Sequence, residues 1–126
     1  MVTASPRATE LGLAAAQAAA DKLARDILLL DVSEQLVITD VFLLASAPSD
    51  RQVLSVVDAI EERLRELGTK PVRREGEKEG RWVLLDFGEV VVHVQHEEER
   101  IYYALERLWK DCPVIPFQDK DLADRA

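Results

Sequence analysis

Apolar residues in the first part of the chain change from a helical spacing to continuous runs. Residues 9–25 carry an apolar stripe at helical spacing, and Thr9 can serve as the N-cap of a helix there. The run ILLLDV at 27–32 is too short and too uniformly apolar for a surface helix, so it predicts a buried strand. Residues 37–46 (VITDVFLLAS) predict a second strand, which follows a turn at 33–35.

The most regular helix of the chain comes next. Ser49 and Gln52 form a capping-box pattern ahead of an apolar face at helical spacing, and Gly68 is suited to end the helix. The face consists of Val53, Val56, Val57, Ile60, Leu64 and Leu67. A polar loop over 68–81 follows, with at most a short edge strand at 72–75.

Two apolar strands and a final helix complete the pattern. Residues 82–87 and 90–95 predict a hairpin that turns at Gly88-Glu89. Both runs are nearly continuous in apolar residues, which indicates burial on both faces and a central place in the sheet. A helix over 97–110 begins with three glutamates, which the positive end of a helix dipole stabilises.

Together these elements predict an α/β (α+β) fold, with one mixed sheet of four to five strands flanked by about three helices. The 126 residues are enough for one domain with its own core. We expect this domain to span 9–112, after a disordered N-terminus at 1–8. Because Pro113 and Pro116 cannot continue a helix, residues 113–126 are expected to form a peripheral tail.

Charge and composition narrow the classes of partner. The formal net charge is −8, from 24 acidic and 16 basic residues. A protein that grips nucleic acid by its phosphates needs a basic footprint, so this balance disfavours direct nucleic-acid binding and suits a basic partner protein. The single cysteine cannot form an internal disulfide, and a reducing, cytoplasmic location is expected. No apolar run approaches the roughly 20 residues that span a bilayer, so no membrane association is expected.

Aromatic side chains provide the candidate binding surface. A continuous helix over 97–110 places six residues on one arc, namely Ile101, Tyr102, Ala104, Leu105, Leu108 and Trp109. Tyr102 and Trp109 lie at the edge of this arc, where each is either a core residue or part of a contact surface. Tyr103 falls on the opposite, polar side, where core packing does not explain a tyrosine. On the preceding strand, Trp82 and Asp86 share one face. The Asp86 carboxylate can either fix a basic residue of a partner or merely end the hairpin.

Residues with metal-binding or catalytic chemistry form no catalytic constellation. His93 and His96 are three residues apart at a strand end, where alternation sends them to opposite faces. Zinc binding beside the neighbouring glutamates is the alternative to a structural or solvated role for both. The aspartates that can in principle gather around magnesium are Asp31, Asp40, Asp50 and Asp86. Turn and capping roles explain two of them, so we expect no metal, no cofactor and no enzymatic activity.

Three segments in a fixed order carry a resemblance to a known family. They are VITDVFLLASAPSDRQV (37–53), GRWVLLDFGEVVVHV (80–94) and EEERIYYALERLW (97–109). These segments resemble the Iojap-like ribosomal silencing factors (RsfS), and the likeness spans about residues 10–110. Local departures are Val41, where the family commonly has an aromatic residue, and Gln95, where it often has Phe or Met.

The resemblance implies a small cytosolic protein, often dimeric, that binds ribosomal protein number fourteen on the joining face of the large ribosomal subunit. Occupying that face blocks the small subunit and represses translation when nutrients are scarce. A nucleotidyltransferase-like fold is also implied, but the sequence lacks the glycine-serine loop and paired Asp-x-Asp of that chemistry. The partner-facing motif of the family, carried over position by position, points to Trp82, Asp86, Phe87, Glu89, Tyr103, Glu106 and Trp109.

Three functions are thus open from the sequence. The favoured one is a factor that prevents subunit association by occupancy, without turnover. The second is a metal-dependent enzyme of the nucleotidyltransferase type, suggested by the fold class and the scattered aspartates. The third is a structural homodimer or scaffold subunit.

Overall fold

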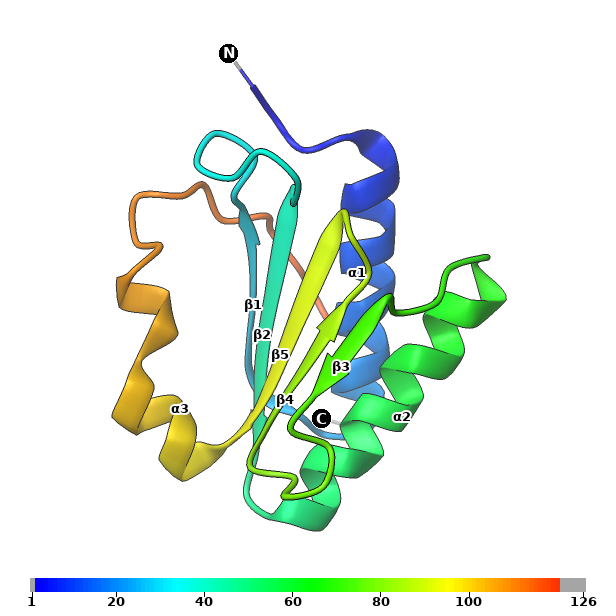
Figure 1. Cartoon of the computed structure of the whole chain (residues 1–126), viewed down its shortest axis with the longest axis vertical. Helices are drawn as coiled ribbons and strands as arrows, with labels where there is room; N and C mark the ends of the chain where they lie inside the picture. Colours follow the sequence, from blue (N-terminus) through cyan, green and yellow to red (C-terminus); the bar gives the residue numbers. More distant parts are fainter. Residues whose placement is uncertain (1, 121–126) are drawn as a thin grey trace.

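The architecture is a mixed five-stranded sheet with helices on both faces, in a computed structural model that describes residues 2–120 (Figure 1). The elements in chain order are α1 (Pro6–Asp21), β1 (Arg25–Asp31), β2 (Val41–Ala47), α2 (Asp50–Glu66), β3 (Arg73–Glu75), β4 (Trp82–Asp86), β5 (Val90–His96), α3 (Glu97–Tyr103) and a 3-10 helix, η1 (Leu105–Arg107). The strand order is β1-β2-β5-β4-β3, and the β2–β5 pair is parallel while the other pairs are antiparallel. The α+β fold with five strands and three α-helices is therefore confirmed.

The two faces of the sheet pack against different helices. Helices α1 and α2 cover one face and form the larger, first core, while α3 lies on the other face (Figure 1). The second core lies under α3 and η1 and contains Leu30, Val32, Phe42, Leu44, Val91 and Cys112. β5 is central and buried along nearly its whole length, as predicted. The prediction that β4 is also buried on both faces is wrong, because its residues alternate between buried and half-buried.

Helix α1 begins earlier than predicted. Ser5 is its N-cap and accepts a hydrogen bond from the Ala8 backbone N–H (3.0 Å), and Pro6 occupies the first helical position. This Ser-Pro pair is a stronger start signal than Thr9, since proline needs no N–H at that position. Residues 6–8, expected within a disordered N-terminus, thus form the first turn of α1; Met1 lies outside the described residues.

The start of the second strand also differs from the prediction. Residues 37–40 form a loop, and β2 begins only at Val41. The Asp40 carboxylate accepts the Ser5 backbone N–H (2.9 Å), and the Thr39 hydroxyl donates to the Gly88 carbonyl (3.1 Å). These side-chain bonds hold the end of the loop against the start of α1 and the β4–β5 turn, and such bonds are common for Asp and Thr near strand ends.

The segment after Cys112 lies along the outer edge of β1. The Asp31 N–H donates to the Pro113 carbonyl (2.8 Å), and the Ile115 N–H donates to the Leu29 carbonyl (2.9 Å). Ile115 and Phe117 then pack against the first core. The described part of the expected peripheral tail therefore covers the β1 edge, because its prolines end a helix but still permit edge pairing. Residues 121–126 of that tail lie outside the described residues.

Candidate functional site

A continuous row of aromatic rings crosses the second face of the sheet. Between ring centroids, Trp82 on β4 lies 6.1 Å from His93 on β5, and His93 lies 5.4 Å from Phe42 on β2. Both ends of the row meet the segment that covers this face: Tyr103 packs 4.8 Å from Trp82, and Trp109 packs 5.1 Å from Phe42. We call these five residues the aromatic row. Tilted and edge-to-face contacts of this kind are favourable and directional, so the row is a rigid feature.

The pairing register of β4 with β5 brings Trp82 and His93 of the aromatic row together. Trp82 lies opposite Gln95, and Leu84 lies opposite His93, so Trp82 and His93 are diagonal neighbours on one face. Large side chains reach across such diagonals. The Trp82 indole Nε1–H donates to Nδ1 of His93 (3.2 Å). Burial lowers the pKa of His93 to about 4, so its ring is neutral at pH 7 and can accept this bond.

A break at Ala104 decides which residues of the last helix are buried. Ala104 adopts a left-handed conformation (φ 45°), which ends α3 after seven residues. The prediction of one helix over 97–110 is therefore wrong, and the arc drawn from it holds only for Leu105 and Trp109, which pack on the second core. Ile101, Tyr102 and Leu108, expected in that arc, are 79%, 81% and 72% exposed.

The buried side chain of α3 is Arg100, which faces the sheet just before the break. Arg100 is 7% exposed, and its Nε lies 3.3 Å from Oε2 of Glu106 in η1. This ion pair bridges the break. Beyond it, Leu105 and Trp109 turn back onto the second core.

The outer side of the same segment is apolar. Ile101, Tyr102, Tyr103 and Leu108, here called the exposed α3 surface, are all large and exposed; Tyr103, at 48%, is the least exposed of the four. Tyr102 and Tyr103 contact each other edge-to-face, with centroids 4.9 Å apart. A concentration of exposed aromatic and aliphatic groups beside a rigid row is typical of a contact surface rather than of random exposure.

Carboxylates surround the start of α3 and are held by one arginine. The Arg81 guanidinium bonds Glu98 (2.9 Å) and Glu99 (2.7 Å) and lies 3.5 Å from Asp50. The hydrogen bond from Arg81 lowers the pKa of Glu98, which stays ionised. His96 caps the helix by accepting the Glu98 N–H at Nδ1 (3.1 Å). The start of α3 is thereby tied to β4.

The residues expected to face a partner divide into two groups. Trp82, Tyr103 and Trp109 come together in the aromatic row, and Glu106 adjoins them through its ion pair with Arg100. Sequence reasoning missed Phe42 and His93 as members of the row. Phe42 and His93 lie on β2 and β5, whose parallel pairing brings the two side chains together, and the pattern of apolar runs does not predict that pairing.

The other three expected residues lie around the β4–β5 hairpin. Asp86 accepts the Gly88 N–H (2.8 Å) and lies 3.8 Å from the Arg73 guanidinium, so it has a hairpin-ending role. The Phe87 ring is buried in the first core, on the opposite face of the sheet from the row. Glu89 is exposed in the turn, where its carboxylate accepts the Ser5 hydroxyl (3.2 Å).

Comparison with known proteins decides the family. The family model described as "Ribosomal silencing factor during starvation" (RsfS) matches residues 5–126. A ribosomal silencing factor RsfS from Bacillus subtilis is 46% identical over 100 residues, which cover 79% of this chain and 85% of that protein. The chain belongs to the RsfS family.

Other RsfS relatives extend the match to structure and to plants. A crystal structure of a Chromobacterium violaceum protein is similar to this chain with a TM-score of 0.78 at 32% identity, covering 93% of this chain and 97% of that one. The chloroplastic protein Iojap of Zea mays is 34% identical over 103 residues, covering 79% of this chain and 43% of that protein. The RsfS family is named for a regulatory role rather than a catalytic one.

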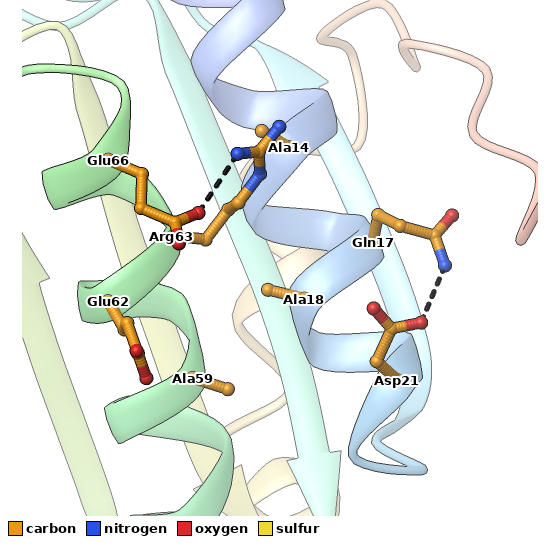
Figure 2. Close-up of a pocket in the computed structure, with 8 residues that line it drawn as sticks. All are labelled: Ala14, Gln17, Ala18, Asp21, Ala59, Glu62, Arg63 and Glu66. Carbon is orange, nitrogen blue, oxygen red and sulfur yellow. Dashed lines mark hydrogen bonds and ion pairs between the residues drawn. The ribbon is translucent and has the colours of Figure 1, made fainter.

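A shallow hollow lies between α1 and α2, on the face opposite the aromatic row (Figure 2). Its volume is about 210 Å³, and alanine methyl groups form part of its wall. Two pairs of the polar groups drawn there bond each other: Gln17 donates to Asp21 (2.9 Å), and Arg63 bonds Glu66 (3.0 Å). For this RsfS-family chain, the hollow offers packing between two helices and no activated group.

The candidate metal-binding residues have local partners. Asp31 accepts the Ser33 hydroxyl (2.6 Å), Asp40 accepts the Ser5 N–H, and Asp50 faces Arg81. Across residues 2–120, no three His, Cys, Asp or Glu side chains gather in a way that could hold a metal ion. Nor does that part of this RsfS-family chain contain a helix long and apolar enough to cross a membrane.

Proposed function

We propose that this RsfS-family protein binds the large ribosomal subunit through ribosomal protein number fourteen and blocks joining of the small subunit. Translation is then repressed when nutrients are limited. The observation that carries the proposal is the exposed α3 surface, whose Tyr103 packs against Trp82 in the rigid aromatic row. Aromatic groups that are exposed yet held in place are preferred anchors of protein interfaces, because little side-chain entropy is lost on binding.

The assigned contact residues have different roles in this proposal. Trp82 and Tyr103 are the anchors, and Trp109 and Phe87 support the sheet from the two cores. Asp86 and Glu89 at the β4–β5 hairpin and Glu106 in η1 supply carboxylates, which with the net charge of −8 suit a basic ribosomal protein.

The mechanism requires occupancy alone. A protein interface of ordinary size covers about 800 Å² on each partner, so a bound factor and the small subunit cannot share the same patch. The repression therefore depends on the affinity and concentration of the factor and needs no chemical step. We place this activity in the cytoplasm and propose that the free protein is a homodimer.

Reassociation of purified ribosomal subunits on a sucrose gradient tests the proposal. We expect the protein to keep the subunits separate. Trp82→Ala and Tyr103→Ala each weaken large-subunit binding by about 2 kcal/mol, or about thirtyfold, if both are central anchors. Thermal unfolding of each variant separates loss of contact from loss of fold.

Val72→Ala is the matched control, because Val72 is 77% exposed and lies outside the exposed α3 surface. It is expected to bind as the wild type does. Normal subunit joining in the presence of excess wild-type protein contradicts the proposal as a whole. Full binding by the Trp82→Ala, Tyr103→Ala double variant contradicts the location of the contact.

A further inference from the structure

His93 is a buried polar ring on the second face of the sheet, and the buried Gln95 lies two residues along β5 on the same face. His93 is 8% exposed, and its neighbours in the aromatic row are Phe42 and Trp82. An apolar side chain at this position fills the same space and contacts Phe42 equally well. Unlike an apolar side chain, the imidazole has an acceptor nitrogen, Nδ1, which accepts the Trp82 indole Nε1–H at 3.2 Å.

This hydrogen bond selects one orientation of the indole. The χ2 torsion of tryptophan has two broad minima, and a flip between them moves the ring N–H to the other side. Accepting at Nδ1 places the His93 proton on Nε2, and burial keeps the ring from taking a second proton near neutral pH. One edge of the indole is thereby fixed.

Tyr103 contacts the same indole. The two ring centroids are 4.8 Å apart, with an angle of 49° between the ring planes. Trp82 is half-buried, so it links a buried acceptor to the tyrosine pair of α3. A flipped or mobile indole changes the support under Tyr103 and therefore the shape of the exposed α3 surface.

We infer that His93 is a positioning residue for partner binding: its Nδ1 atom holds the Trp82 indole in the orientation that presents Trp82 and Tyr103 to the ribosomal partner. This inference rests on the proposed function, which it deepens by one residue that does not itself touch the partner.

A double-mutant cycle with purified large ribosomal subunits tests the inference. His93→Phe keeps an aromatic ring but removes the acceptor, and we expect it to weaken binding by about fivefold to tenfold. His93→Asn restores an acceptor at the position of Nδ1 and is expected to bind within about twofold of wild type. Trp82→Phe removes the donor, so adding His93→Phe to it has no further effect.

Fluorescence reports on the indole independently of binding. Trp109→Phe leaves Trp82 as the sole tryptophan of the chain. In this background we expect His93→Phe to shift the Trp82 emission to longer wavelength and to increase quenching by acrylamide, and His93→Asn to leave both unchanged. If His93→Phe does not fold, His93→Leu replaces it, since leucine also lacks an acceptor.

The outcomes separate the two claims. Unchanged binding by His93→Phe, together with weakened binding by Trp82→Ala, overturns the role of His93 and leaves the proposed function intact. A full effect of His93→Phe in the Trp82→Phe background also overturns it, because His93 then acts through another contact. Unchanged binding by both Trp82→Ala and Tyr103→Ala overturns the proposed surface, and with it the role of His93 in binding, whatever the fluorescence shows.

Discussion

The buried guanidinium of Arg100 meets the carboxylate of Glu106 across the break in the last helix, with Nε and Oε2 3.3 Å apart. Arg100 is 7% exposed, and its Nη1 is buried without a hydrogen-bond partner among the described residues. Glu106 thus compensates a charge that cannot be neutralised by deprotonation. The pair fixes the direction in which the chain continues towards Trp109.

Removing this carboxylate should destabilise the protein. We expect Glu106→Ala to lower the free energy of unfolding by about 2 kcal/mol, because it leaves the Arg100 charge buried and unpaired. Chemical denaturation measures the change. Glu98→Ala is the control, since Glu98 is highly exposed, and it should lower the free energy of unfolding clearly less than Glu106→Ala does. Equal stabilities of the two variants contradict a structural role for Glu106.

Glycine at the helix break should stabilise the protein. Ala104 has φ 45°, a conformation that is unfavourable for a residue with a Cβ. We expect Ala104→Gly to raise the melting temperature, through a gain of about 0.5–1 kcal/mol. Ala59→Gly, in the interior of α2, should have the opposite sign and a similar size. A lower melting temperature for Ala104→Gly argues against the left-handed break.

The free energy of unfolding should decrease as the pH is lowered through the range in which His93 titrates. Its pKa is about 4 in the folded chain, below the ordinary value of 6.5, so the unfolded chain binds the proton first as the pH falls. The contribution of the neutral ring is complete above about pH 6.5 and is lost as the pH falls from there to 4, by up to about 3 kcal/mol. Urea unfolding at a series of pH values measures the slope.

His93→Phe removes the titrating group and should flatten this slope between pH 6.5 and 4. His96, a helix cap at the surface end of the same strand, is unchanged in both proteins. The same slope in the variant and the wild type assigns the acid sensitivity to other groups.

The segment along β1 should contribute to stability. Ile115 packs against the first core, whereas the neighbouring Val114 is 60% exposed. We expect Ile115→Ala to cost about 1–2 kcal/mol and Val114→Ala less than about 0.5 kcal/mol, because only the first exchange removes buried methyl groups. Denaturation of both variants compares them directly. Matching small losses would mean that this segment does not belong to the packed structure.

Most of the framework follows from local sequence signals. The Ser49 hydroxyl accepts the Gln52 N–H (3.1 Å) as the capping pattern predicts, although the Gln52 side chain bonds the Lys22 carbonyl instead of reaching back. Gly68 ends α2 with a positive φ of 92°. These signals depend on neighbours in the chain, which is why the sequence alone reveals them.

The misjudged parts depend on tertiary partners. No periodicity predicts a left-handed Ala104, because the break is stabilised by an ion pair between the buried Arg100 and the partly exposed Glu106. The aromatic row escaped notice for the same reason, since Phe42 and His93 meet only when β2 and β5 pair. A continuous helix predicts Tyr103 on the polar side away from the sheet, whereas the fold packs its ring against Trp82.

The parallel pairing of β2 with β5 constrains how the nascent chain reaches its native state. Residues 41–47 have no neighbour on that side until residues 90–96 have been made, and β4 and β3 join the sheet only through β5. Contacts between residues so distant along the chain form slowly. Until β5 is made, the edge of β2 that will pair with it is unpaired. Completion of the sheet is therefore a late event in the synthesis of this protein.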